Sequence, residues 1–133
     1  MLSKPVLTLE EANRMIDAAF AEADKNEWKV TVAVVDDGGH ILAMRRMDGC
    51  APIASYIAPQ KARSAALGRR DTSEFEAMIN GGRTAVLSAP EVSGLLEGGV
   101  PLKVEGQVVA AIGVSGVKPD QDAQVAKAGI AAL

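Results

Sequence analysis

The chain has 133 residues, of which 48% are hydrophobic, and a formal net charge of −3 at pH 7. This length fits one domain, and the hydrophobic content suits a folded core and excludes disorder. The mildly acidic balance argues against nucleic-acid binding, which needs a strongly basic face. A single cysteine excludes an internal disulfide framework, and no apolar run approaches the roughly 18 residues of a membrane span. We therefore expect a single-domain cytoplasmic protein with neither nucleic acid nor a membrane as partner.

The first half of the chain predicts a helix, a hairpin and a further helical region. Thr8 and Glu11 have capping-box spacing, and apolar residues then recur with helical spacing over residues 9–24. Strands are predicted over residues 29–35 and 40–46, joined by an Asp-Asp-Gly-Gly turn. Neither face of the first strand is strongly polar, so the sheet is expected to be covered on both faces.

An alanine-rich helix is predicted over residues 53–70. Pro59 lies inside it and predicts either a kink or a short helix followed by a second one that starts near the proline. A shorter helix then begins with Thr72 or Ser73 as its cap and ends at an Asn-Gly-Gly stop.

The second half of the chain predicts three strands and a closing helix. Strand character is found in residues 92–96, 101–104 and 107–114, with a Glu-Gly turn joining the last two. The closing helix starts at Pro119, and Asp120 is expected to cap it. Because hairpins imply antiparallel pairing, the residues predict an α+β sandwich and not a doubly wound parallel sheet.

Six short motifs follow one another along nearly the whole chain: Val34-Val35-Asp36-x-x-Gly39, Arg46-Met47-Asp48-Gly49, Lys61-Ala62-Arg63-x-Ala65-Ala66, Gly98-Gly99-Val100-Pro101, Gly113-Val114-Ser115-Gly116 and Gln121-Asp122-x-x-Val125-Ala126. In this order and spacing the chain resembles the GlcG/HbpS-like family, which includes the C-terminal domain of PduO-type proteins. The resemblance implies a profilin-like or PAS-like fold, with a five-stranded antiparallel sheet and helices on both faces. It also implies homo-oligomers (dimers, tetramers or octamers) and an association with haem binding, corrinoid metabolism or catabolic gene clusters.

His40 is the only histidine of the chain and directly follows the Gly-Gly turn. Histidine is the usual proximal ligand of haem iron, so His40 is the candidate metal ligand if haem is the cofactor. The alternative is a solvent-facing residue at the edge of a hairpin. Tyr56 and the five methionines are weaker candidates, and packing is the expected role for each of them.

Lys61 is the candidate anchor for a carboxylate, because it occupies a motif position in an otherwise apolar helix. Asp122, at the start of the last helix, is expected to accept a proton or to orient Lys61. The alternative for the lysine is a surface side chain whose stem lies along the apolar surface.

Two glycine-rich turns offer backbone amides for an anion, and Ser115 offers a hydroxyl beside them. The alternative is turn chemistry and close backbone packing, which explains most glycines. The candidate ligand-binding residues of these turns are Gly98, Gly99, Gly113, Ser115 and Gly116.

Three hypotheses for function follow. The first is a small-ligand binding protein, possibly for haem, with its pocket between the Lys61 helix and the glycine turns. The second is a cofactor-independent catabolic enzyme acting on a small carboxylate, in which Lys61, Ser115 and Asp122 support proton transfer, tautomerisation or hydrolysis. The third is a structural or sensory oligomer. We place ligand binding first.

Overall fold

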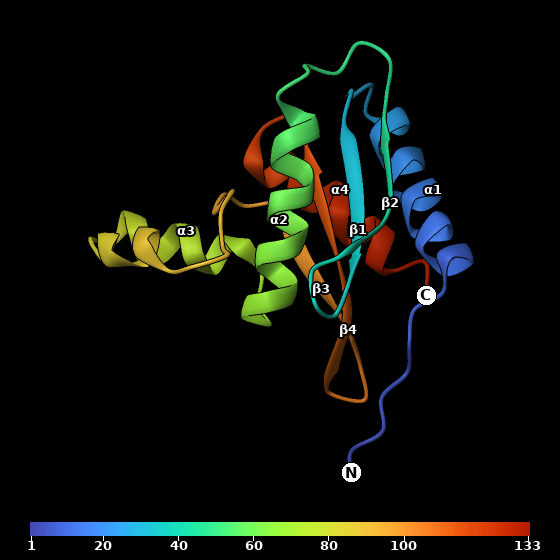
Figure 1. Ribbon diagram of the computed structural model, residues 1–133. Helices are drawn as coiled ribbons and strands as arrows, with labels where there is room; N and C mark the ends of the chain where they lie inside the picture. The colour runs from blue at the N-terminus through green and yellow to red at the C-terminus, as the bar shows by residue number, and fades with distance from the viewer.

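The computed structural model describes residues 1–133 as a four-stranded antiparallel sheet with helices on both faces. Strand order is β2-β1-β4-β3. Figure 1 shows α2 on one face of the sheet and α1 and α4 on the other. The elements, in chain order, are α1 (Leu9–Lys25), β1 (Thr31–Asp36), β2 (Ile41–Arg46), α2 (Ala54–Gly68), α3 (Thr72–Asn80), the 3-10 helix η1 (Thr84–Ser88), β3 (Gly99–Val104), β4 (Gln107–Ser115) and α4 (Pro119–Ile130).

The predicted α+β class and the two covered faces are confirmed, but the fifth strand is wrong. Residues 92–96 are irregular and lie against α2 instead of pairing with the sheet. Gly94 has φ +58°, and a Cβ added there would come within 2.8 Å of the Gln60 Cβ. The Leu96 carbonyl accepts a hydrogen bond from the Thr72 hydroxyl, so this backbone bonds to a helix and β3 remains an edge strand.

Alternation along β1 and the residue before it produces two separate cores. Val30, Val32 and Val34 belong to a core formed with α1 and α4. Ala33 and Val35 belong to a smaller core formed with the alanines of α2. Both sets are fully buried, which explains why neither face of this strand carries strongly polar residues.

The helix α1 begins as predicted. The Thr8 hydroxyl accepts from the Glu11 amide at 3.1 Å, and the Glu11 carboxylate accepts from the Thr8 amide at 3.0 Å. This reciprocal capping satisfies two amide groups that have no partner inside the helix.

The predicted division into two helices at Pro59 is wrong, because α2 runs as one helix through the proline, while the alternative of a kink stays a prediction. Pro59 lies in the second turn, where its missing N–H removes one backbone hydrogen bond. Ala58 and Ala62 on either side of it are fully buried against the sheet. Gly113 of β4 lies so close that an added Cβ would be 2.1 Å from the Ala58 carbonyl oxygen. Close packing therefore holds the helix on the sheet across the proline.

The two predicted caps in the second half are also wrong. Asp71 stands at the N-cap of α3, while the Thr72 hydroxyl bonds to backbone groups of residues 96 and 99. Lys118 stands at the N-cap of α4, where its amide donates to the Gln121 side chain at 3.3 Å.

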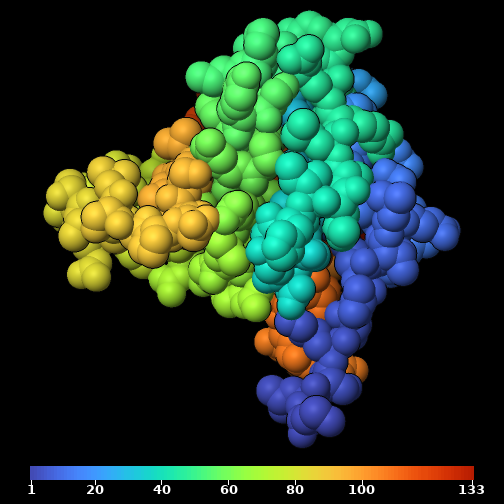
Figure 2. Space-filling view, in the orientation of Figure 1, coloured from blue at the N-terminus to red at the C-terminus, as the bar shows by residue number.

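Figure 2 shows the α3–η1 segment projecting from the body of the molecule. No helix has the length and apolarity needed to cross a membrane.

Candidate functional site

Lys61 and Asp122 form an ion pair in the interior. The Lys61 Nζ lies 2.9 Å from the Asp122 Oδ2 and donates a second hydrogen bond, also of 2.9 Å, to the Val114 carbonyl. The second carboxylate oxygen of Asp122 accepts from the Val117 amide at 3.1 Å. Both charged side chains are only 3% exposed. The pair thus ties α2 and α4 to the end of β4.

Burial raises the pKa of the Asp122 carboxyl, and the charge and hydrogen bond of Lys61 offset part of that rise. The native state therefore holds a proton on Asp122 more readily than the unfolded chain does. This direction shows that desolvation of the carboxylate outweighs the attraction of its partner, as is common for ion pairs removed from water.

The glycines of the predicted site serve close packing in this fold. A Cβ added at Gly98 would lie 2.8 Å from the Lys61 Nζ, and one added at Gly99 would lie 2.3 Å from the Lys61 carbonyl oxygen. Gly113 lies under α2, and Gly116 lies against the backbone of Lys29 and Val30. Ser115 is 7% exposed at the end of β4.

Sequence reasoning placed Lys61, Asp122 and Gly98 together, and the structure brings them into contact. None of the five surface hollows is lined by Lys61, Ser115 or Asp122. The Gly98 backbone lies close to the lysine ammonium, because a Cβ added there would come within 2.8 Å of the Nζ.

His40 lies away from this pair, at the turn between β1 and β2. Its side chain is 80% exposed, and its Nδ1 lies 3.0 Å from the Asp36 Oδ1. A carboxylate partner places the proton on Nδ1, which leaves the Nε2 lone pair free for a ligand. Burial opposes the charge on Asp36, but hydrogen bonds from the His40 and Gly38 amides and from the imidazole bring the pKa of this carboxyl below its usual value. Asp36 therefore favours its charged form, which is the form that accepts a hydrogen bond from the ring.

The imidazole lines a surface hollow of about 400 Å³ between this turn and α2. Gly39, with φ +83°, brings the turn onto the helix: a Cβ there would come within 2.9 Å of the Arg63 Cγ. Arg63 also forms an ion pair with Glu91. The residues that line the hollow are Gly39, His40, Ile41, Pro59, Gln60 and Arg63.

Five of the six residues of this hollow, all except His40, were missed by the sequence analysis. Pro59, Gln60 and Arg63 recur at helical spacing on one face of α2, which was the available signal, but nothing in the sequence said that the turn would lie on that face. Asp36 was interpreted as a turn residue, and its second role as the partner of His40 follows only from the geometry. No group of three or more His, Cys, Asp or Glu side chains is arranged to hold a metal ion.

Together these features define a small α+β domain with a closed internal ion pair and an exposed histidine hollow. The chain belongs to the family described as "Haem degrading protein HbpS-like", whose model matches residues 7–131.

Individual relatives agree with this membership. Protein GlcG of Escherichia coli K12 is 56% identical over 115 residues, which cover 86% of this chain and 85% of that protein. A crystal structure of an HbpS double mutant from Streptomyces reticuli has a TM-score of 0.91 at 36% identity, covering 100% of this chain and 90% of that one. The "PduOC:Heme Complex" has a TM-score of 0.87 at 26% identity, covering 97% and 96% of the two chains.

Proposed function

We propose that this protein binds haem, with His40 as the iron ligand. The observation that carries the proposal is the Asp36–His40 pair, which occupies Nδ1 and leaves Nε2 without a partner on an exposed side chain that lines a hollow. Iron-binding histidines commonly have their other ring nitrogen bonded to a carboxylate or a carbonyl. The solved haem complex of a relative supports the choice of ligand class.

The residues of the hollow suit this group. Ile41 and Pro59 give it apolar walls, and Arg63, which pairs with Glu91 in this structure, gives it a cation that would exchange this partner for a propionate. His40 would hold the iron, and Asp36 would hold the imidazole in one tautomer. Haem supplies redox and ligand-binding chemistry where it binds.

Titration of the purified protein with hemin, followed by absorbance, tests the proposal. We expect a saturable Soret band with one haem per chain, and a weaker, shifted band in His40→Ala. Asp36→Asn keeps an acceptor for the turn amides but lowers the basicity of the ring, and is expected to weaken binding about 10- to 100-fold. Asp37→Asn changes the neighbouring acid, which bonds to Lys4 instead, and is the matched control. An absence of saturable binding, or equal binding by His40→Ala, would contradict the proposal.

We also propose that the chain self-associates through the face formed by β2 and the start of α2, named here the α2–β2 face. The two elements lie side by side on the face seen in Figure 2. Ile41 and Met44 pair with Val35 and Ala33, so they point to the α2 side of the sheet. Yet Ile41 is 56% exposed and Tyr56 on α2 is 72% exposed. A second copy would cover these side chains and the open side of the His40 hollow, which shares Ile41 with this face.

Acid–base catalysis by Lys61, Ser115 and Asp122 has no comparable support. Lys61 and Asp122 satisfy each other in the interior, and no hollow opens onto them. We assign this pair to holding the fold together.

A further inference from the structure

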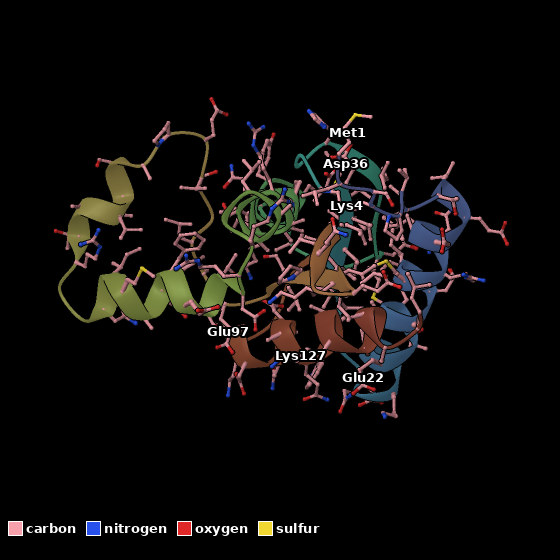
Figure 3. All side chains as sticks on the ribbon, turned by 90° about the horizontal axis from the view of Figure 1, so that it is seen from below. Met1, Lys4, Glu22, Asp36, Glu97 and Lys127 are labelled. Atoms are coloured by element: carbon pink, nitrogen blue, oxygen red, sulfur yellow. The ribbon has the colours of Figure 1, made fainter.

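We propose a second ligand site, for a small polyanion, at the end of the molecule where the β3–β4 hairpin, the C-terminus of α2 and the N-terminal segment meet. The site is a hollow of about 420 Å³ that contains three cationic side chains and one hydrophobic residue. Figure 3 looks onto this end, where Lys4 lies next to the turn that holds Asp36. The lining residues are Lys4, Arg69, Lys103, Gly106, Gln107 and Val108.

The three cations come from separate parts of the chain and converge on one place. Lys4 belongs to the N-terminal segment, Arg69 follows α2, and Lys103 lies on β3. The whole chain carries a net charge of −3, so this concentration of positive charge is local and opposite in sign to the rest. A hollow lined by one sign of charge concentrates counter-ions of the other sign.

One nearby acidic group, Asp37, pairs with a cation of the hollow, while Glu105 in the β3–β4 turn is exposed and does not line it. Asp37 bonds to the Lys4 Nζ at 2.5 Å, and this bond and the lysine charge keep the pKa of Asp37 below its usual value. Arg69 donates only to carbonyl oxygens, those of Asp37 and Ala66, at 2.6 and 3.0 Å. Lys103 forms neither an ion pair nor a side-chain hydrogen bond. Arg69 and Lys103 therefore form no ion pair with a carboxylate, although the charge of Arg69 acts on Asp37.

The exposure of the hollow indicates how many charges its ligand must carry. Each single contact between exposed charges is weak in water and is screened by salt. A ligand with two or more anionic groups gains several contacts while it loses its freedom only once. The forked donors of Arg69 suit carboxylate and phosphate oxygens equally well, and these are the two chemistries that the hollow would accept. The site is separate from the His40 hollow and shares no lining residue with it.

Calorimetry and thermal unfolding with two probes, pyrophosphate and citrate, test the site. We expect saturable binding of at least one probe and a rise in Tm that sodium chloride at matched ionic strength does not reproduce. Pyrophosphate alone would identify a phosphate site and citrate alone a carboxylate site, and either result supports the proposal.

Lys103→Gln is the decisive variant, because this exposed side chain bonds to nothing and its loss leaves the fold intact. It is expected to weaken binding about three- to tenfold, while the exposed Lys118→Gln, which removes the same charge elsewhere, has no effect. Binding of neither probe, or equal binding by Lys103→Gln and Lys118→Gln, would overturn the proposal. Hemin titration of Lys103→Gln keeps the two sites apart, since we expect an unchanged Soret band whether or not the anion binds.

Discussion

At the scale of single residues, exposure separates two clusters that both look reactive in the sequence. The Lys61 and Asp122 side chains are 3% exposed and bond to each other, whereas the His40 side chain is 80% exposed and has one ring nitrogen free. A buried, mutually satisfied ion pair has little to offer a ligand, while an oriented and exposed imidazole is available to one. The sequence could nominate both clusters, because both consist of chemically capable residue types. Their burial depends on tertiary packing, which no local pattern reports.

Gly38→Ala tests whether the orientation of His40 matters. A Cβ at this position would lie 2.9 Å from the His40 Cε1 and 3.1 Å from its Nδ1, and Gly38 has no positive φ that would strain an alanine. The ring must therefore move while the turn remains. We expect hemin affinity to fall about tenfold with Tm unchanged, measured by absorbance titration and thermal unfolding. Unchanged hemin affinity in a folded variant would mean that iron binding does not depend on the position of the His40 ring.

Lys61→Met tests the energetic role of the ion pair through pH. The folded pKa of Asp122 lies above its unfolded value, so the native state binds the extra proton and the free energy of unfolding falls as pH rises between the two. Without Lys61, nothing from that side chain offsets the desolvation of Asp122, so the folded pKa of Asp122 rises further. The free energy of unfolding then falls by a larger amount, over a range that extends to higher pH. We expect the variant to lose about 3–5 kcal/mol at pH 7 and to regain part of it as the pH is lowered toward 5.

Urea unfolding across this pH range measures the effect. The double variant Lys61→Met with Asp122→Leu is the control, because it leaves no buried charge and is expected to be less sensitive to pH than the single variant. A loss of stability that is the same at every pH would show that the carboxylate is not the source of the cost.

At the scale of elements, local signals predicted some boundaries well and long-range contacts decided the others. The capping box of α1 and the two hairpin turns involve residues close in sequence, so they could be predicted. The segment 92–96 has a composition typical of a strand, but its hydrogen-bonding partner is Thr72, more than twenty positions away. The continuity of α2 through Pro59 depends in the same way on how tightly Ala58 packs on β4.

Thr72→Val tests the anchor that holds the segment between α3 and β3. The Thr72 hydroxyl donates to the Leu96 carbonyl at 2.5 Å and accepts from the Gly99 amide at 2.9 Å. Valine has the same shape but leaves both backbone groups without a partner, so we expect a loss of about 1–3 kcal/mol in urea unfolding. Thr72→Ser retains the hydroxyl and is expected to be the more stable of the two variants. The opposite order would show that packing of the methyl group, and not the hydrogen bonds, fixes this segment.

At the scale of the whole molecule, the surface carries features that the sequence did not predict. The resemblance to a family indicated oligomers and haem, but the α2–β2 face and the polyanion hollow arise from residues that are distant in sequence and adjacent in the fold. Composition reports only the overall acidic charge of the chain. It cannot show that three cationic side chains lie together in the hollow around Lys103.

Self-association is tested by charged substitutions on the α2–β2 face. Ile53, the N-cap of α2, and Tyr56 are exposed at the start of this helix. Ile53→Asp and Tyr56→Asp place a carboxylate where we propose that a second copy packs, so we expect both variants to dissociate to a smaller species in light scattering after size exclusion. Leu87→Asp is the matched control, because Leu87 and Ile53 are both 63% exposed and Leu87 lies on the projecting α3–η1 segment. Dissociation by Leu87→Asp alone would place the interface on that segment instead.

The central claim, that His40 supplies the iron ligand, is tested most directly by chemical rescue. His40→Ala is loaded with hemin, and imidazole is added while the Soret band is followed. We predict that imidazole restores the Soret band position of the wild-type protein in a saturable manner, because a free ligand then replaces the missing ring. A band in His40→Ala that already matches the unchanged protein, and that imidazole leaves where it is, would contradict the account and place the iron elsewhere.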